Sequence, residues 1–144
     1  MSKTLLVTGG TGSFGNAVVK KFLNSKTYSE VRIFSRDESK QDKMAQEYNN
    51  SKLSFYLGDV RDEDRIKHVS KGVDVIFHAA ALKIVPSCEN ATWETIKTNI
   101  IGSKNVIEAA ISNKIKNLTL LSTDKSVYPI NTMGMTKALV EKMA

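Results

Sequence analysis

A glycine-rich segment near the N-terminus constrains the fold of this chain more than any other feature. The segment, residues 8–15 (TGGTGSFG), follows an apolar run at 4–7 and precedes apolar positions that recur at helical spacing. A strand, a glycine turn and a helix in this order predict a phosphate-binding site, because the free N–H groups of the helix N-terminus face an anion. The residues of this predicted site are Gly9, Thr11, Gly12, Ser13, Phe14 and Gly15. The alternative is a glycine-containing loop that binds nothing.

Strand-like and helix-like segments alternate along the whole chain. We expect strands at 4–8, 31–34, 53–57, 73–77 and 118–122, and helices at 14–25, 38–48, 91–112 and from 132 to the end. A further short helix could be capped by Asp62. Apolar strands separated by helices predict an α/β fold: a doubly wound, Rossmann-like parallel sheet with strand order 3-2-1-4-5. Ligands bind such sheets at the carboxyl ends of the strands, near the first and fourth strands.

The composition is that of an ordinary globular domain, with 41% hydrophobic and 25% charged residues in 144. No apolar run is long enough to span a membrane. The lone cysteine, Cys88, excludes an internal disulfide and fits the reducing cytoplasm. The net charge of +6 comes from scattered lysines, which favours anionic small ligands over nucleic acid. Two histidines and one cysteine have no metal-ligand spacing, so no metal site is expected.

The chain ends inside an expected helix, at residues 141–144, without a closing turn. We therefore expect residues 1–144 to be the N-terminal part of a larger protein. The fifth strand would lie at an uncovered edge of the sheet. This bare edge makes a homo-oligomer the expected state.

Two residues at the end of the second strand indicate which dinucleotide the chain binds. NAD-binding sheets place an acidic residue there, about 20 residues after the glycine turn, to accept from the ribose 2′-OH. This chain has Ser35 and Arg36 instead, and an arginine suits a 2′-phosphate. The pair predicts NADP rather than NAD. The alternative is a surface arginine paired with Asp37 or Glu38.

Residues after the third and fourth strands would lie in the same cleft. Asp59 and Val60 follow the third strand, where an adenine would lie, although Asp59 could equally form a turn beside Gly58. His78 ends the fourth strand and is as compatible with a structural role as with a functional one. The remaining predicted contacts are three small residues that admit a flat cofactor, a lysine that could face phosphates or a sugar, and a helical amide that needs partners: Ala79, Ala80, Ala81, Lys83 and Asn99.

The end of the fifth strand and the start of the last helix carry the candidate catalytic groups. Hydroxyls, a carboxylate and an amine follow one another there, at Ser122, Thr123, Asp124 and Lys125. Such a set could supply an acid and a base, or it could be a polar turn. Met133 and Lys137 are four residues apart and share one face of the last helix, so Lys137 could reach the nicotinamide ribose.

These motifs together resemble the extended short-chain dehydrogenase/reductases, and most of all the bacterial UDP-N-acetylglucosamine 4,6-dehydratases of capsule and O-antigen polysaccharide biosynthesis. The resemblance implies bound NADP, a UDP-sugar substrate, hydride removal from C4, proton removal at C5 with or without inversion, loss of water from C6 and return of the hydride. It also implies that Asp124 is the general acid at C6, that Lys125 is the base at C5 and that Thr123 binds near C4.

Two departures from the family pattern leave alternatives open. Met133 stands where the superfamily usually has a tyrosine that deprotonates the C4 hydroxyl, and Tyr128 is the nearest phenol in sequence. Family members are also about twice as long as this chain, so the resemblance implies that residues 1–144 are a truncated NAD(P)-binding domain from which the C-terminal substrate domain is absent. The alternatives are a non-catalytic NADP-binding module and a UDP-hexose 4-epimerase, which shares the C4 oxidation. The Asp124-Lys125 pair favours dehydration over epimerisation.

Overall fold

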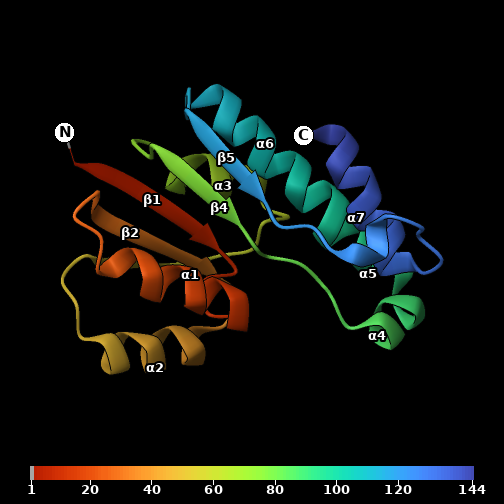
Figure 1. Cartoon of the computed structure of the whole chain (residues 1–144), viewed down its shortest axis with the longest axis horizontal. Helices are drawn as coiled ribbons and strands as arrows, with labels where there is room; N and C mark the ends of the chain where they lie inside the picture. Colours follow the sequence, from red (N-terminus) through yellow and green to blue (C-terminus); the bar gives the residue numbers. More distant parts are fainter. Residues whose placement is uncertain (1) are drawn as a thin grey trace.

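The computed structural model describes residues 2–144, which form one parallel sheet between two layers of helices (Figure 1). The elements in chain order are β1 (Lys3–Thr8), α1 (Ser13–Leu23), β2 (Tyr28–Ser35), α2 (Glu38–Tyr48), β3 (Leu53–Leu57), α3 (Glu63–Val69), β4 (Val75–His78), α4 (Val85–Asn90), α5 (Thr92–Ile96), the π-helical turn η1 (Lys97–Ile101), α6 (Gly102–Ser112), β5 (Asn117–Leu120), the 3-10 turn η2 (Asp124–Ser126) and α7 (Thr132–Met143). All strand pairs are parallel, and the order β3-β2-β1-β4-β5 confirms the predicted doubly wound sheet.

The alternating side chains of the central strands pack into two separate hydrophobic cores, one on each face of the sheet. On one face, Leu5 and Val7 of β1 pack with apolar residues of α1 and α2; on the other, Leu6 packs with those of α3 and α6. Figure 1 shows these helix pairs on opposite sides of the sheet. Both faces of β1 are therefore buried, which explains why its sequence is a continuous apolar run. Asp62 caps α3 as predicted, because its side chain accepts from the Arg65 N–H at 2.9 Å.

The helical stretch predicted over 91–112 is confirmed, because residues 92–112 are helical without a break, but the sequence did not indicate its π-helical turn or the helix before it. The segment contains α5, the π-helical turn η1 and α6, and a further helix, α4, precedes it. Ala91 separates α4 from α5 with φ −128° and ψ 54°, which is outside the helical region. The apolar periodicity continues through η1, so the sequence pattern does not reveal the wider turn.

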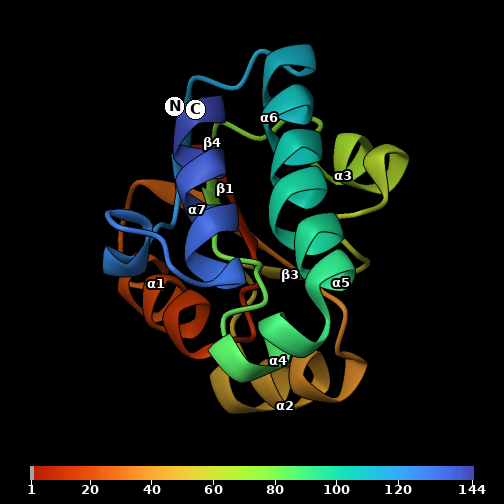
Figure 2. The same cartoon turned by 90° about the vertical axis from the view of Figure 1, so that its right-hand side faces the viewer.

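Strand ends differ from the expected ranges by up to three residues. β2 starts at Tyr28 rather than 31, because its first residues pair with the start of β1. β5 ends at Leu120, so Ser122 lies beyond the strand rather than in it. β5 is at the edge of the sheet, as expected, and α7 lies beside α6 (Figure 2). Within residues 2–144, no helix has the length and apolarity needed to cross a membrane.

Candidate functional site

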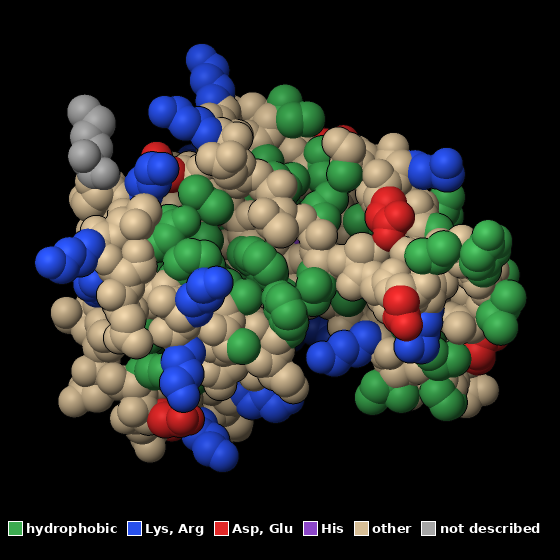
Figure 3. Space-filling model, in the orientation of Figure 1, with side chains coloured by type: hydrophobic (Ala, Val, Ile, Leu, Met, Phe, Trp, Pro, Cys, Tyr) green, Lys and Arg blue, Asp and Glu red, His purple; other side chains and the backbone are tan. Residues whose placement is uncertain are grey.

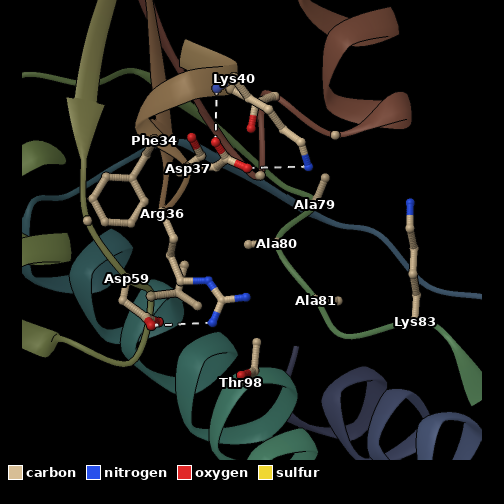
Figure 4. Close-up of a pocket in the computed structure, with 16 residues that line it drawn as sticks. Phe34, Arg36, Asp37, Lys40, Asp59, Ala79, Ala80, Ala81, Lys83 and Thr98 are labelled. Atoms are coloured by element: carbon tan, nitrogen blue, oxygen red, sulfur yellow. Dashed lines mark hydrogen bonds and ion pairs between the residues drawn. The ribbon is translucent and has the colours of Figure 1, made fainter. Parts of the chain in front are cut away.

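Two adjoining cavities lie at the carboxyl ends of the strands. The larger, with a volume of about 590 Å³, extends from the end of β1 past Arg36 and Asp59 to Thr98 (Figure 4). The smaller, of about 270 Å³, lies between the start of α1, the segment after β5 and α7. Both are lined by Gly9, Gly12, Ala79, Ala81 and Lys83. These shared residues make the two cavities one continuous cleft, which Figure 3 shows as a hollow between the α1–α2 side and the α4 side.

The glycine turn forms the middle of this cleft. Gly9 has φ +66°, and a Cβ there would lie 2.7 Å from the Ala80 backbone nitrogen, so β1 and the segment after β4 approach as closely as glycine allows. Gly12 is the N-cap of α1 and provides no side-chain hydrogen bond to the first turn. The N–H groups of that turn are therefore available to an anion.

The other predicted residues of the turn are distributed over the cleft. Thr11 lines the larger cavity, whereas Phe14 and Gly15 line the smaller one. The Phe14 ring stacks on Phe77 of β4, with ring centroids 5.7 Å apart. Ser13 is the first residue of α1 and lines neither cavity.

Arg36 lies across the larger cavity but pairs with a different carboxylate from the two considered. Its Nη1 is 3.6 Å from Asp59 Oδ2. Arg36 therefore pairs with Asp59 and not with Asp37 or Glu38. Asp37 instead caps α2 by accepting from the Lys40 N–H, and it pairs with the Lys40 ammonium. Ser35 is buried and accepts a hydrogen bond from Gln41 Nε2 at 3.0 Å. The basic groups at this end of the cleft are thus Arg36 and Lys40.

Asp59 lies in a turn after β3 and also lines the larger cavity beside Val60. Arg61 donates to it from Nε at 2.9 Å and from its backbone N–H at 3.0 Å. Burial alone would raise the pKa of Asp59, but these hydrogen bonds and the charges of Arg61 and Arg36 outweigh it and lower the pKa. Much of the acceptor capacity of Asp59 is therefore used by arginine, and its predicted contact with adenine stays a prediction.

His78 is fully buried and bonded at both ring nitrogens. Its Nδ1 is 2.6 Å from Thr8 Oγ1 and its Nε2 is 3.0 Å from Ser103 Oγ. Ser103 Oγ donates to the Asn99 carbonyl, so it must accept from His78, which assigns the proton to Nε2. Burial, aided by the charge of Lys137, lowers the pKa of His78 to about 3. The residue is a neutral structural link between β1, β4 and α6.

Asn99 holds the segment after β4 rather than facing the cleft. Its Oδ1 accepts from the Leu82 N–H at 2.8 Å, and its Nδ2 donates to the Leu82 carbonyl at 2.9 Å and to Thr136 Oγ1 at 3.0 Å. Asn99 lines neither cavity. The three alanines and Lys83 do line the cleft, and Asn99 fixes the backbone that carries them.

The residues after β5 divide between the cleft and the solvent. Ser122, Thr123 and Lys125 line the smaller cavity. Asp124 does not; its side chain is 89% exposed, and a hydrogen bond from Thr123 Oγ1 and the charge of Lys125 lower its pKa. Hydroxyls of Ser122 and Ser126 contact the carboxylate of Glu141, which ties this turn to α7.

Met133 and Lys137 line the smaller cavity from α7, as their spacing predicts. Lys137 is 7% exposed, and burial lowers its pKa. Its Nζ donates to the Leu121 carbonyl at 2.8 Å. Tyr128 is 87% exposed and lines neither cavity, so it does not place its phenol at the Met133 position.

Sequence reasoning missed three groups at the site. Lys40, four residues after Arg36, could have been recognised as a second basic side chain on the same side of the cleft. Thr98 lines the larger cavity, and Glu141 holds the turn after β5. The positions of Thr98 and Glu141 depend on how the helices pack against the sheet, and no local sequence pattern predicts them. Across the described residues, no group of three or more His, Cys, Asp or Glu side chains is arranged to hold a metal ion.

Known proteins with similar sequence or structure share this N-terminal arrangement. The family model described as polysaccharide biosynthesis protein matches residues 5–144. A UDP-glucose 4-epimerase of Rickettsia prowazekii is 57% identical over all of this chain. Among solved structures, Pen from Bacillus thuringiensis superposes on 99% of this chain with a TM-score of 0.95 at 35% identity. The matched part is 44% of Pen. A second solved structure is DesIV of Streptomyces venezuelae, a dTDP-glucose 4,6-dehydratase with NAD and TYD bound. It superposes with a TM-score of 0.87 over 97% of this chain and 51% of DesIV. At 23% identity, this similarity shows the fold alone.

The chain spans 43% of the length of the Rickettsia relative. The match to the family model nevertheless covers the glycine turn, the segment after β4 and the start of α7. The fold, the cleft at the carboxyl ends of the strands and this match agree with one another. The chain therefore belongs to the polysaccharide biosynthesis protein family, and it is similar in sequence to proteins named UDP-glucose 4-epimerase.

Proposed function

We propose that this chain is the cofactor-binding half of a nicotinamide-dependent UDP-sugar enzyme of surface polysaccharide biosynthesis, and that its reaction is 4-epimerisation. The continuous cleft carries the proposal: a glycine turn at its centre, Arg36 at one end and Lys137 at the other. The name of the Rickettsia relative supports the epimerase more than it supports the 4,6-dehydratase that the sequence motifs favour.

The residues present fit a dinucleotide. A Cβ at Gly9 would close the gap between β1 and the segment after β4, and the uncapped first turn of α1 offers N–H donors to a diphosphate. When bound, the dinucleotide would supply the hydride acceptor for C4 of the sugar. Ala79–Ala81 leave room along the cleft, and the buried Lys137 ammonium would favour negative charge near the reacting hydroxyl.

A 4,6-dehydratase is the second candidate, favoured by Thr123 and Lys125 on the wall of the smaller cavity. Lys125 would remove the C5 proton in that reaction. Asp124 is less suited to its predicted role, because a general acid needs a bound proton and the pKa of this exposed carboxyl is lowered. A non-catalytic binding module is the third candidate, since Met133 has no ionisable proton.

Product analysis in D₂O separates the three candidates. The full reading frame that contains this chain would be incubated with UDP-glucose and with UDP-N-acetylglucosamine, and the products followed by NMR. An epimerase gives the C4 epimer without deuterium, because the hydride returns to the same carbon. A dehydratase gives a 4-keto-6-deoxy sugar with deuterium at C5, and Lys125→Ala abolishes that product. A binding module gives neither product.

We propose NADP as the cofactor, because Arg36 and Lys40 supply positive charge where a 2′-phosphate would lie. The alternative cofactor is NAD, which the DesIV structure contains. Calorimetric titration of the 144-residue chain measures both dissociation constants. We expect NADP⁺ to bind more tightly and Arg36→Ala to remove most of the difference. Equal or tighter binding of NAD⁺ to the unaltered chain would overturn the preference.

A further inference from the structure

One face of α7 holds the segment that runs from the end of β5 to η2. Gly134, Lys137 and Glu141 recur at helical spacing, so they share this face. A Cβ on Gly134 would collide with the Lys125 carbonyl oxygen, so helix and turn touch through their backbones. Lys137 Nζ donates to the Leu121 carbonyl at 2.8 Å. The segment is thus fixed to α7 near both of its ends.

Glu141 adds a further contact, one helical turn beyond Lys137. Its Oε1 accepts from Ser122 Oγ, and from Ser126 Oγ at 2.6 Å. The Ser126 side chain is buried between α7 and the turn, and its hydroxyl also lies 2.6 Å from the Thr123 carbonyl. Hydrogen bonds to a charged acceptor are stronger than those between neutral groups. Glu141 therefore supplies much of the polar attachment of this turn to α7.

The turn held in this way carries side chains that line the smaller cavity. Thr123 and Lys125 line it, whereas the intervening Asp124 is exposed to solvent. Glu141 and Ser126 line neither cavity. The conformation of the turn therefore decides which side chains face the cleft, and Glu141 acts on that conformation from outside the cleft.

The turn has little to hold it besides α7. Its 3-10 segment is three residues long, and the N–H groups of Ser126 and Val127 each donate to the carbonyl three residues earlier at 3.2 Å. This distance is at the long end of the usual range, and 3-10 hydrogen bonds have poor geometry. Loss of the Glu141 contact should therefore loosen the turn.

We propose that Glu141 is a positioning residue, which holds η2 on α7 so that Thr123 and Lys125 face the sugar. The inference rests on the proposed function and extends it to a residue outside the cleft. A displacement of about 1 Å at a reacting group can lower a rate about a hundredfold, even when its cause lies away from the chemistry. Dinucleotide binding should change little, because the glycine turn belongs to β1 and α1.

The test compares Glu141→Ala with Glu141→Gln in the full reading frame that contains this chain. Alanine removes the acceptor, whereas glutamine keeps an Oε1 for the serine hydroxyls. We expect Glu141→Ala to lower kcat for the UDP-sugar by about tenfold or more, and to change the dissociation constant of the dinucleotide by less than about threefold. Glu141→Gln should keep kcat within about threefold. Equal loss of kcat in both variants would overturn the inference, as would a parallel loss of dinucleotide binding in Glu141→Ala.

Two further variants control this comparison. Glu47→Ala removes another exposed carboxylate from the last turn of a helix, at a position that lines neither cavity, and should leave kcat unchanged. Ser126→Ala removes a hydroxyl through which Glu141 acts. Combining Ser126→Ala with Glu141→Ala should therefore lower kcat no further than Glu141→Ala alone. Independent, additive losses would contradict the proposed route.

Hydrogen exchange in the 144-residue chain tests the same contact without any turnover. Exchange at the Ser126 and Val127 amides should be faster in Glu141→Ala and unchanged in Glu47→Ala. Unaltered exchange in Glu141→Ala would overturn the inference. Failure of the unaltered full-length protein to convert either UDP-sugar would instead overturn the proposed function, and the exchange rates would still decide whether Glu141 holds the turn.

Discussion

His78 shows how burial assigns a role to a single residue. Its ring links Thr8 to Ser103, and through Ser103 to the Asn99 carbonyl. The bond to Ser103 requires a proton on Nε2, and burial lowers the pKa so that the imidazole is neutral. The sequence left structural and functional roles equally open for this residue. The position of His78 inside the fold, away from both cavities, makes it structural.

The first prediction concerns the pH dependence of stability. The pKa of His78 falls from 6.5 to about 3 on folding, so in this window the unfolded chain binds a proton that the folded chain does not. The free energy of unfolding should therefore fall as the pH falls from 6.5 to 5, by up to about 1.4 kcal/mol per pH unit. Urea denaturation should show this slope in the unaltered chain and in His68→Gln, but not in His78→Gln. The same slope in His78→Gln would contradict the assignment.

A second prediction at the residue scale separates close packing from backbone conformation. Gly9 and Gly72 both have positive φ, at +66° and +71°. A Cβ at Gly9 would collide with Ala80, whereas none of the described atoms lies within 4 Å of a Cβ at Gly72. Gly72→Ala should cost about 1 kcal/mol for its conformation alone. Gly9→Ala should cost at least about 3 kcal/mol in urea denaturation. Equal losses would mean that the close approach of β1 to Ala80 contributes nothing.

At the scale of elements, the segment after β4 is held by helices that lie far away in sequence. Asn99 of η1 clamps both backbone groups of Leu82, and Thr136 of α7 completes the clamp. The alanine wall of the cleft therefore depends on two helices that do not themselves line it at these residues.

The third prediction tests this clamp. Asn99→Asp keeps the acceptor but loses the two donors, and places a carboxylate beside the Leu82 carbonyl. We expect a loss of about 2–4 kcal/mol in the free energy of unfolding, together with faster hydrogen exchange at the Leu82 amide. Asn50→Asp is the control: Asn50 Oδ1 only accepts, from the Lys52 N–H, so the change should cost less than about 0.5 kcal/mol. Unaltered exchange at Leu82 in Asn99→Asp would show that the clamp is not needed.

At the scale of the whole molecule, α6 and α7 lie side by side in an outer layer (Figure 2). Both helices carry exposed apolar side chains. Met135 and Leu139 lie four residues apart on α7 and are each 49% exposed. Figure 3 also shows hydrophobic side chains gathered at the end of the molecule that carries α4. Apolar surface of this kind favours association between copies of the chain.

The fourth prediction is that the 144-residue chain self-associates through α7. Sedimentation velocity over a range of concentrations should detect a dimer or larger species. The double variant Met135→Glu with Leu139→Glu should sediment as a monomer, because charge on both positions opposes burial. Leu57→Glu, at an equally exposed position on the opposite edge strand β3, should associate like the unaltered chain. Monomeric behaviour of the unaltered chain at all concentrations would contradict this prediction.

The sequence by itself determined the sheet, its strand order and the place of the cleft. These features follow from local signals: apolar runs, helical periodicity and the glycine turn at 8–15, which act over short distances in the chain. The side chains that line the cleft were also largely predictable, because the carboxyl ends of parallel strands meet at one edge. Asp62 as a helix cap is a signal of the same local kind.

Only the tertiary structure decided which polar groups face the cleft and which hold the fold. Asn99 and Asp124 were placed in the site by sequence reasoning, yet one clamps Leu82 and the other is exposed to solvent. Thr98 lies next to Asn99 in the chain, but it lines the larger cavity whereas Asn99 lines neither cavity. The direction of a side chain depends on how its helix meets the sheet, and that contact joins residues about 40 positions apart, such as Val60 and Gly102.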